Sequence, residues 1–342
     1  MFPKGGTLDL SQDYKFSGGD VKISKNITIN GNNHVLDESL NSRINLNANG
    51  ISVVFKNLIF KNGRSGDGGA ILNTHSSSSI TLVNCQFISN YADDNGGAVY
   101  TKGDLYVDGC TFKSNTVDDD GGSICALGKI TVIKNSIFSE NEDKGSVTRT
   151  SNGGAIYSKN SLTIDSCTFE DNMADDNGGA IYANGNINIT ESVFKNNKAD
   201  DDDSGAVYCT GNMYIFHTLF ESNKAYVDGG AVFCEGKITA KYSRFAYNNA
   251  SGAVQRCFGG AIRSKGTCNL TGCDFAQNYA EDYGGAIYAD GNLYLYGEHY
   301  TEGESFYTWD AFVGNDAVNY GGAVYVKGNF YINLGKEPSI RG

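Results

Sequence analysis

A four-residue motif, Gly-Gly-Ala followed by Ile or Val, recurs ten times in this chain of 342 residues and limits its possible folds more than any other feature. Serine replaces the third residue of one copy, at Ser123, and the first residue of another, at Ser204. Four of the nine intervals between copies are 25 residues, and the others are longer. Such a period is typical of stacked-repeat proteins and not of a globular domain with one site. The copies begin at Gly68, Gly96, Gly121, Gly153, Gly178, Ser204, Gly229, Gly259, Gly284 and Gly321.

One repeat, residues 178–197, shows what each copy adds to the backbone. It predicts a strand over Ala180–Ala183, a turn at Gly185, a second strand over Ile187–Ile189 and a third short strand ending at Phe194. The 44 glycines argue against helical repeats of similar period, because glycine disfavours helix. We therefore expect an all-β chain that forms a single right-handed parallel β-helix, with about 25 residues and three short strands per coil.

Comparing the copies position by position separates inward from outward side chains. The residue after the motif's Ala is always Ile or Val, which marks an inward position. Strand alternation then points the next residue outward. Arg263 at that position supports the assignment, because an unpaired buried guanidinium would be costly. These outward residues, called the tyrosine row below, are Leu72, Tyr100, Cys125, Tyr157, Tyr182, Tyr208, Phe233, Arg263, Tyr288 and Tyr325.

A second signature, Phe-x-x-Asn, follows the motif in nine of the ten repeats. Stacked Phe rings would fill the core, and Asn side chains in register would hydrogen-bond along the stack as a ladder. Both are structural devices, so we expect no catalytic role for them. The pairs are Phe87/Asn90, Phe112/Asn115, Phe138/Asn141, Phe169/Asn172, Phe194/Asn197, Phe220/Asn223, Phe245/Asn248, Phe275/Asn278 and Phe312/Asn315.

The two signatures together resemble the repeats of chlamydial polymorphic outer-membrane proteins and of adhesin-like surface proteins of methanogenic archaea. The first segment, with Gly6-Thr-Leu-Asp-Leu, Asp13-Tyr14 and Ile27 to His34, is similar to the start of the archaeal proteins. The resemblance implies an extracellular, cell-surface protein that is not an enzyme, a rigid adhesin-like stalk or binding module for glycans or for surface proteins of another cell. It brings no catalytic residues. It divides the chain into N-terminal coils over residues 1–67 and a ten-repeat body over residues 68–342.

Two other functions stay open at this point. Similar repeats occur in carbohydrate-active β-helix enzymes, either polysaccharide lyases or glycoside hydrolases. Such enzymes need carboxylates at a defined separation, or a metal with a basic residue nearby. Here acidic residues recur in nearly every repeat, which favours architecture over one active site. The third alternative is a passive spacer.

Charge and hydropathy exclude several partners. The net charge of −12 argues against nucleic acid and against an anionic membrane surface. No apolar run approaches the roughly 20 residues of a membrane span. We expect the chain to be a mature segment of a longer surface protein, truncated at its C-terminal end.

The nine cysteines allow two interpretations. Cys85, Cys110, Cys167 and Cys273 share a position that other repeats fill with Ser or Thr, which favours free thiols as small core side chains. Adjacent repeats nevertheless place some cysteines about 5 Å apart, near disulfide reach. The candidate pairs are Cys85/Cys110 and Cys209/Cys234, with Cys257 and Cys268 as a further pair. No Cys-x₂-Cys pair is present, so zinc is not expected.

Acidic turns precede most copies of the motif and would stack along one edge. Neighbouring carboxylates repel each other, and a hard cation such as Ca²⁺ would relieve the repulsion. The candidate ligands are Asp175, Asp176, Asp201 and Asp202. The alternative is a solvated turn in which aspartates accept hydrogen bonds from turn amides, with no cofactor at all.

Three insertions interrupt the repeat, at Glu142–Ser151, Ser251–Phe258 and Gly297–Asp310. The third holds the only tryptophan, Trp309, with Tyr307 beside it. Loops on a rigid scaffold are where repeat proteins most often vary their contacts. The candidate ligand-binding residues are therefore Trp309 and Tyr307, together with Tyr182, Tyr208 and Tyr288 of the tyrosine row. Asn-x-Ser/Thr triplets, which fit a surface protein, begin at Asn26, Asn188, Asn249 and Asn269.

Overall fold

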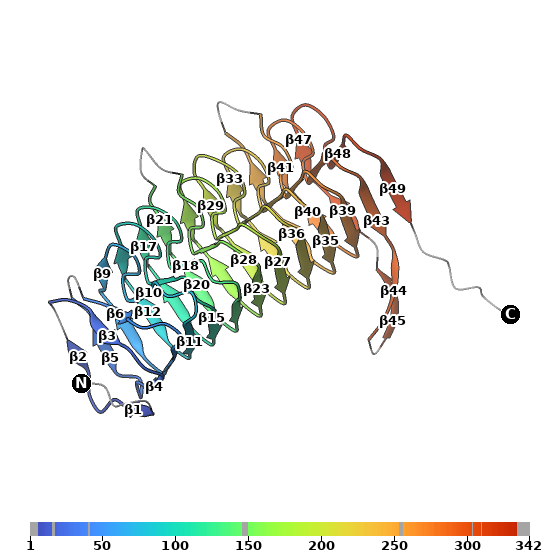
Figure 1. Ribbon diagram of the computed structural model, residues 1–342. Helices are drawn as coiled ribbons and strands as arrows, with labels where there is room; N and C mark the ends of the chain where they lie inside the picture. Colours follow the sequence, from blue (N-terminus) through green and yellow to red (C-terminus); the bar gives the residue numbers. More distant parts are fainter. Residues whose placement is uncertain are drawn as a thin grey trace.

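The computed structural model shows one parallel β-solenoid, in which successive coils stack into a rod (Figure 1). It describes residues 6–15, 18–39, 42–145, 150–252, 256–302, 304–308 and 310–333, with side chains left out over 298–308. No helix occurs within these ranges, which confirms the all-β prediction. Four long sheets run the length of the rod, and each strand pairs in parallel with its counterpart one coil away.

The first sheet, called the motif sheet, contains the ten strands that begin at the Ile or Val of the Gly-Gly-Ala motif, preceded by two strands from the N-terminal coils. Ile181 pairs with Ile156 on one side and with Val207 on the other, as the stacking of motif copies predicts. Its strands are β3 (Val21–Ile23), β6 (Ile44–Leu46), β10 (Ile71–Asn73), β14 (Val99–Thr101), β18 (Ile124–Ala126), β22 (Ile156–Ser158), β26 (Ile181–Ala183), β30 (Val207–Cys209), β34 (Val232–Cys234), β38 (Ile262–Ser264), β42 (Ile287–Ala289) and β48 (Val324–Val326).

The second sheet, called the groove sheet, carries the next strand of each coil. Its strands alternate cleanly: Ile187 and Ile189 are buried in the core, whereas Asn188 is exposed. They are β1 (Thr7–Asp9), β4 (Ile27–Asn30), β7 (Ser52–Lys56), β11 (Ser79–Val83), β15 (Leu105–Asp108), β19 (Thr131–Lys134), β23 (Leu162–Asp165), β27 (Ile187–Thr190), β31 (Met213–Phe216), β35 (Ile238–Lys241), β39 (Cys268–Thr271), β43 (Leu293–Tyr296) and β49 (Phe330–Asn333).

The third sheet, called the phenylalanine sheet, holds the Phe-x-x-Asn signature. Its Phe rings stack with neighbouring centroids 4.6–5.0 Å apart from Phe60 to Phe312. The strands are β2 (Tyr14–Lys15), β5 (Val35–Asp37), β8 (Ile59–Lys61), β12 (Gln86–Ile88), β16 (Thr111–Lys113), β20 (Ile137–Ser139), β24 (Thr168–Glu170), β28 (Val193–Lys195), β32 (Leu219–Glu221), β36 (Arg244–Ala246), β40 (Asp274–Ala276) and β46 (Ala311–Val313).

The fourth sheet, called the corner sheet, corrects the prediction of three strands per coil. Ten two-residue strands pair between the ladder asparagine and the acidic turn, and they are too short to give an alternating sequence pattern. They are β9 (Arg64–Ser65), β13 (Tyr91–Ala92), β17 (Thr116–Val117), β21 (Glu142–Asp143), β25 (Met173–Ala174), β29 (Lys198–Ala199), β33 (Lys224–Ala225), β37 (Asn249–Ala250), β41 (Tyr279–Ala280) and β47 (Asp316–Ala317). The turns that follow them, called the acidic corner, form the upper edge of the rod in Figure 1.

The asparagine ladder is formed as predicted. The side-chain amide nitrogen of Asn197 donates to the side-chain oxygen of Asn223, at 2.9 Å, and to the carbonyl oxygen of Phe169, at 3.0 Å. The Asn172 amide donates in the same way to Asn197. These buried amides therefore satisfy each other and the adjoining backbone, which explains why a polar residue recurs inside the coil.

The two motif glycines are required by the backbone. Gly178 has a φ of +70°, and a Cβ atom there would lie 2.3 Å from the carbonyl oxygen of Ile181. A Cβ atom on Gly179 would lie 2.3 Å from the carbonyl oxygen of Gly205 in the next coil. Side chains at these positions would separate the coils.

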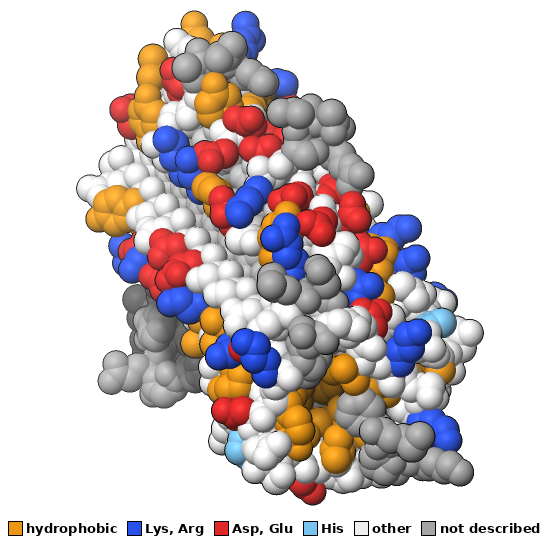
Figure 2. Space-filling view, turned by 90° about the vertical axis from the view of Figure 1, so that its left-hand side faces the viewer, with side chains coloured by type: hydrophobic (Ala, Val, Ile, Leu, Met, Phe, Trp, Pro, Cys, Tyr) orange, Lys and Arg blue, Asp and Glu red, His pale blue; other side chains and the backbone are white. Residues whose placement is uncertain are grey.

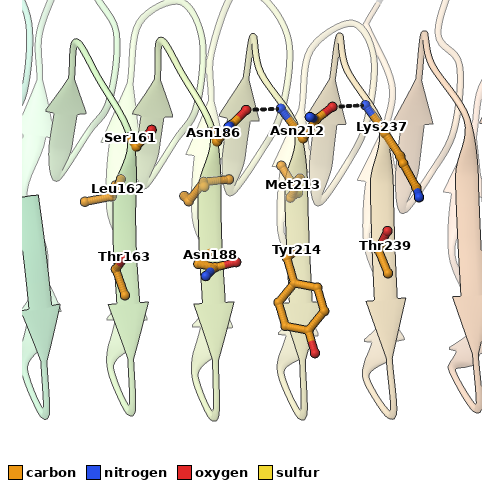
Figure 3. Close-up of a pocket in the computed structure, with 11 residues that line it drawn as sticks. Ser161, Leu162, Thr163, Asn186, Asn188, Asn212, Met213, Tyr214, Lys237 and Thr239 are labelled. Atoms are coloured by element: carbon orange, nitrogen blue, oxygen red, sulfur yellow. Dashed lines mark hydrogen bonds between the residues drawn. The ribbon is translucent and has the colours of Figure 1, made fainter. Parts of the chain in front are cut away.

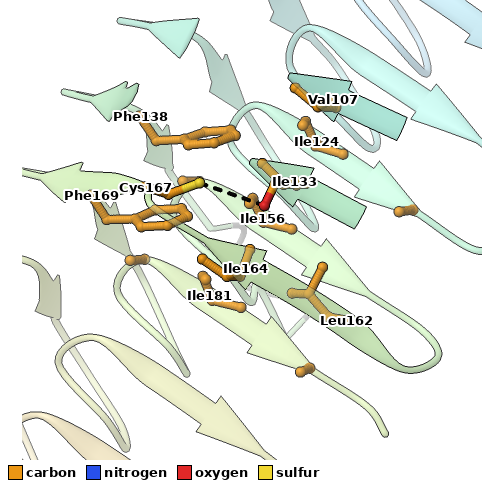
Figure 4. Close-up of a cluster of buried hydrophobic side chains, with 14 of the residues drawn as sticks. Val107, Ile124, Ile133, Phe138, Ile156, Leu162, Ile164, Cys167, Phe169 and Ile181 are labelled. Carbon is orange, nitrogen blue, oxygen red and sulfur yellow. Dashed lines mark hydrogen bonds between the residues drawn. The ribbon is translucent and has the colours of Figure 1, made fainter. Parts of the chain in front are cut away.

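Most cysteines pack as small core side chains. All nine are buried, seven of them lie in the main core, and no disulfide is formed among the described residues. In Figure 4 the Cys167 thiol lies beside the stacked rings of Phe138 and Phe169 and donates to the carbonyl oxygen of Ile133. Cys257 lies at the acidic corner and Cys268 begins β39 of the groove sheet, so the two belong to different sides of the coil.

Candidate binding surface

Two rows of outward side chains run along the rod, one on the motif sheet and one on the groove sheet. They differ in exposure. Six of the ten side chains of the tyrosine row are buried, whereas all ten of the second row are exposed or half-buried in the same coils. This second row, called the groove row, consists of Thr81, Tyr106, Val132, Thr163, Asn188, Tyr214, Thr239, Asn269, Tyr294 and Tyr331.

The tyrosine row points out of the coil as predicted, but other residues cover much of it. At one end Leu72, Tyr100 and Cys125 form a small buried cluster outside the main core. In the middle the Tyr182 ring stacks on Tyr208, with centroids 5.0 Å apart, and both side chains are half-buried. The faces that a ligand would use are therefore partly occupied by neighbouring rings.

The environment of Arg263 differs from the one that we used to assign its position outward. We expected an exposed guanidinium, yet the residue is only 6% exposed. Its Nε atom lies 3.1 Å from Asp228 and its Nη2 atom 2.5 Å from Asp290, so the charge is buried and paired. The guanidinium also lies over the Tyr288 ring, 4.5 Å from its centroid.

Tyr288 is enclosed by neighbouring side chains. The Phe258 ring stacks on it with centroids 4.5 Å apart, Tyr325 stacks on it at 5.1 Å, and Tyr288 is 3% exposed. Phe258 belongs to the second insertion, and its backbone N–H donates to Asp228 at 2.8 Å. Of the three tyrosines of the tyrosine row predicted to contact a ligand, the structure therefore leaves Tyr182 and Tyr208 half-exposed and buries Tyr288.

The acidic corner contains carboxyl groups whose pKa values are raised by burial. Burial raises the pKa of Asp203 to about 8, with the nearby carboxylates of Asp228 and Asp202 adding to the shift. Burial also raises the pKa of Asp228 to about 6, although Arg263 opposes the change. Acidic side chains gather in several groups on the face in Figure 2, with lysine and arginine side chains between them.

The four predicted calcium ligands do not gather into one centre. Asp176 accepts a hydrogen bond from the backbone N–H of Ser151 at 2.6 Å, and Asp201 is exposed. Burial raises the pKa values of Asp175 and Asp202, and neighbouring aspartates raise them further. Within the described residues, no group of three or more His, Cys, Asp or Glu side chains is placed to hold a metal ion.

The groove sheet carries a shallow depression of about 340 Å³ over strands β23, β27, β31 and β35 (Figure 3). Its outward floor is formed by Thr163, Asn188, Tyr214 and Thr239, one from each strand. Asn188 and Thr239, whose side chains are smaller, lie on either side of Tyr214, which is half-buried. The lining residues include no carboxylate and a single charged side chain, that of Lys237.

The upper rim of the depression is a row of turn residues. The side-chain oxygen of Asn186 accepts from the backbone N–H of Asn212 at 2.8 Å, and that of Asn212 accepts from the N–H of Lys237 at 2.9 Å. Figure 3 shows these two bonds running from strand to strand. The rim is therefore held by the backbone, while hydroxyl and amide groups of the floor face outward.

A second group of exposed aromatic rings lies further along the same sheet. Tyr294 stacks on Tyr331 at 4.6 Å and lies 6.1 Å from Tyr296. Our sequence reasoning missed both groups because it considered only the strand after the motif. Tyr-x-Phe in β31 and Tyr-x-Tyr in β43 alternate with core residues and could have indicated them.

The third insertion forms an antiparallel hairpin of β44 (Glu298–Glu302) and β45 (Glu304–Thr308). It projects from the C-terminal end of the rod in Figure 1. Tyr307 pairs with His299 across this hairpin, and Trp309 lies outside the described residues.

The geometry defines this protein as a parallel β-solenoid with one covered and one open lateral face. Comparison with protein families identifies it further. The family model described as a right handed beta helix region matches residues 69–239, half of the chain, and the chain belongs to this family. A Chlamydia polymorphic membrane protein repeat matches residues 272–290. No curated protein and no solved structure matches the chain. In the described part of the chain, no helix has the length and apolar character needed to cross a bilayer.

Proposed function

We propose that this protein is a non-enzymatic, adhesin-like cell-surface protein that binds glycans in the depression of its groove sheet. The polymorphic membrane protein repeat at residues 272–290 supports a location at the outer membrane or cell surface. The right-handed β-helix supports a rigid rod that carries a binding surface along its side. Glycans, or surface proteins that carry them on another cell, are the proposed partners.

The observation that carries this proposal is the chemistry of the depression. A sugar ring has an apolar face, which packs on an aromatic ring, and hydroxyl groups, which bond to hydroxyls and amides. Tyr214 supplies the ring, while Thr163, Asn188 and Thr239 supply the polar groups around it. The floor is shallow, which suits an extended chain lying across the strands better than an enclosed small molecule.

The same lining favours binding over hydrolysis. Glycosidases place two carboxyl groups on either side of the bond that they break. The carboxyl groups of Asp203 and Asp228 lie instead at the acidic corner, where they accept backbone hydrogen bonds. This arrangement supports a structural use of those carboxyl groups.

A glycan array tests the proposal. The protein is produced in a host without N-glycosylation, because Asn188 in the depression begins an Asn-Ile-Thr triplet. We expect binding by the wild type and at least a tenfold loss, about 1.4 kcal/mol, in Tyr214→Ser. The matched control is Tyr182→Ser with Tyr208→Ser, which alters the tyrosine row alone.

Each outcome of the array separates the alternatives. Loss of binding in the control with retention in Tyr214→Ser would move the site to the tyrosine row. Binding that survives in both variants would place it elsewhere, with the hairpin beside Trp309 as the next target. Release of reducing ends or unsaturated sugars in a polysaccharide assay would contradict the non-enzymatic part. If the folded wild type binds no glycan, the passive spacer would remain as the alternative function.

A further inference from the structure

Asp143 occupies a position that apolar or small residues fill in every other coil. It is the second residue of β21, where it pairs with Val117. Its equivalents along the corner sheet are Ser65, Ala92, Val117, Ala174, Ala199, Ala225, Ala250, Ala280 and Ala317. The carboxyl group is buried, with 1% of the residue exposed. A charge in an alanine position needs compensation that the other coils do not need.

Among the described residues of this corner, two buried oxygen atoms have no hydrogen-bond partner. One carboxyl oxygen of Asp143 accepts from the backbone N–H of Gly145 at 3.1 Å, but its Oδ2 atom is buried without a partner. Ser151, at the other end of the same insertion, is fully buried, and its Oγ atom is also unpartnered. Buried polar atoms are satisfied in most proteins, so each exception calls for a ligand or another explanation.

Other carboxylates surround Asp143 and none of them stabilises its charge. Asp120, Asp119 and Asp175 all act to raise its pKa, in addition to the larger effect of burial. Asp175 comes close enough that its Oδ2 atom would lie 2.0 Å from a Cβ atom on Gly145. The carboxyl groups of Asp143 and Asp175 therefore both contact Gly145, whose φ of +64° turns its N–H toward Asp143.

We propose that Asp143 and Ser151, near the two ends of the first insertion, form a cation site of the Ca²⁺ class with Asp175, in which the two aspartates are the charged ligands and Ser151 is a neutral oxygen ligand. Two carboxylates match the charge of one divalent ion. Calcium completes its shell with backbone carbonyls and water, so a third carboxylate is not required. Asp175 is also one of the four calcium ligands predicted from the sequence. The other three, Asp176, Asp201 and Asp202, are not ligands in the proposed site.

Calorimetry with CaCl₂, alongside thermal unfolding in CaCl₂ and in chelator, tests this site. Asp143→Ala is the main variant, because alanine is the usual residue at this position and the coil should fold. We expect it to be more stable than the wild type in chelator and to lose calcium binding. Asp175→Asn should raise the dissociation constant about tenfold or more. Asp201→Asn with Asp202→Asn is the matched control and should bind as the wild type does.

Three results would overturn the proposal. A wild type whose melting temperature and heat of titration are indifferent to CaCl₂ would do so, and so would full binding by Asp143→Ala. Calcium binding that is lost only in the Asp201 and Asp202 variant would place the ion one turn further along the acidic corner. None of these measurements involves glycan, so the cation site stands or falls independently of the proposed function.

Discussion

Strand alternation points the side chains of both the tyrosine row and the groove row outward. The two rows nevertheless differ in exposure, because the tyrosine row is largely covered and the groove row is not. In one coil, Tyr208 on the motif sheet and Tyr214 on the groove sheet are separated by five positions of chain, and both point outward. The motif sheet adjoins the acidic corner, and residues of that corner such as Phe258 and Asp228 pack over its outer face. In most coils a tight glycine turn connects the motif-sheet strand to the next groove-sheet strand, and this turn does not fold over the outer face of the groove sheet.

The difference teaches that strand alternation gives the direction of a side chain but not its exposure. Exposure depends on the loops beside the sheet. Tight turns such as the one at Gly211 leave their sheet open, whereas the longer corner turns fold back over theirs. A search for binding residues in a solenoid should therefore begin on the sheet whose flanking turns are shortest.

The largest expected effect is a pH dependence of the free energy of unfolding, which arises from carboxyl groups of the acidic corner. Folding raises the pKa of Asp203 to about 8 and that of Asp120 to about 6, both above the unfolded value of 3.8. Such groups stabilise the fold fully below the unfolded pKa, and this contribution is lost as the pH rises through the folded pKa. We expect unfolding in chelator to become easier by about 3 kcal/mol or more between pH 5 and pH 8.5.

Asp203→Asn supplies the control for this pH dependence. The variant should flatten the slope, because asparagine does not titrate and can still accept the hydrogen bond from the Asp228 N–H. Stability that rises over the same pH range would contradict the burial of these carboxyls.

Replacing Arg263, the buried cation of the tyrosine row, should give the next largest change in stability. Arg263→Ala leaves Asp228 without its cation and leaves Asp290 with Lys327 alone, and it removes the contact with the Tyr288 ring. We expect a loss of about 2–3 kcal/mol in urea unfolding at pH 8, and less at pH 5, where Asp228 can take up a proton. Thr239→Ala, on the groove row, should change stability by less than about 0.5 kcal/mol.

The double change Tyr182→Ser and Tyr208→Ser should destabilise the rod moderately. It removes two half-buried rings that stack at 5.0 Å, and the hydrogen bond from Tyr208 to Glu235. We expect a loss of about 2 kcal/mol in urea unfolding. If stability were unchanged, the tyrosine row would be more open than the structure indicates.

The smallest expected effect on stability is that of Tyr214→Ser. Its ring lies on the open face, so we expect a change below about 1 kcal/mol, while glycan binding is lost. A large loss of stability would instead give Tyr214 a structural role like that of Tyr208 and weaken the contrast between the two rows.

Much of the fold follows from residues that recur. Each coil places the same kind of residue in the same environment, as with Ile181 and its equivalents, the Phe194 series and the Asn197 ladder. Comparison of the repeats therefore identifies the inward positions. The two-residue strands of the corner sheet were missed, since Lys198–Ala199 is too short to alternate. Arg263 was assigned outward for the wrong reason, because a partner such as Asp290 lies 27 residues away in another coil.

The candidate sites were less predictable than the fold. The tyrosine row stood out because it adjoins a conspicuous motif, while Tyr214 lies within a strand that has no fixed signature. Asp143 could have been noticed as a carboxylate in an alanine position, had the corner strands been recognised and aligned. The acidic turns indicated a charged edge, but not which carboxylates are buried.

The sequence by itself determined that the chain is a solenoid, which residues point inward and how one coil stacks on the next. Those properties depend on local periodicity and on contacts with an equivalent residue one repeat away. Only the tertiary structure decided which outward row is covered, that Arg263 is paired, and that Asp143 Oδ2 and Ser151 Oγ are buried with no hydrogen-bond partner among the described residues. These depend on how non-equivalent segments fold over one another, and burial and electrostatic pairing act through space and not along the repeat.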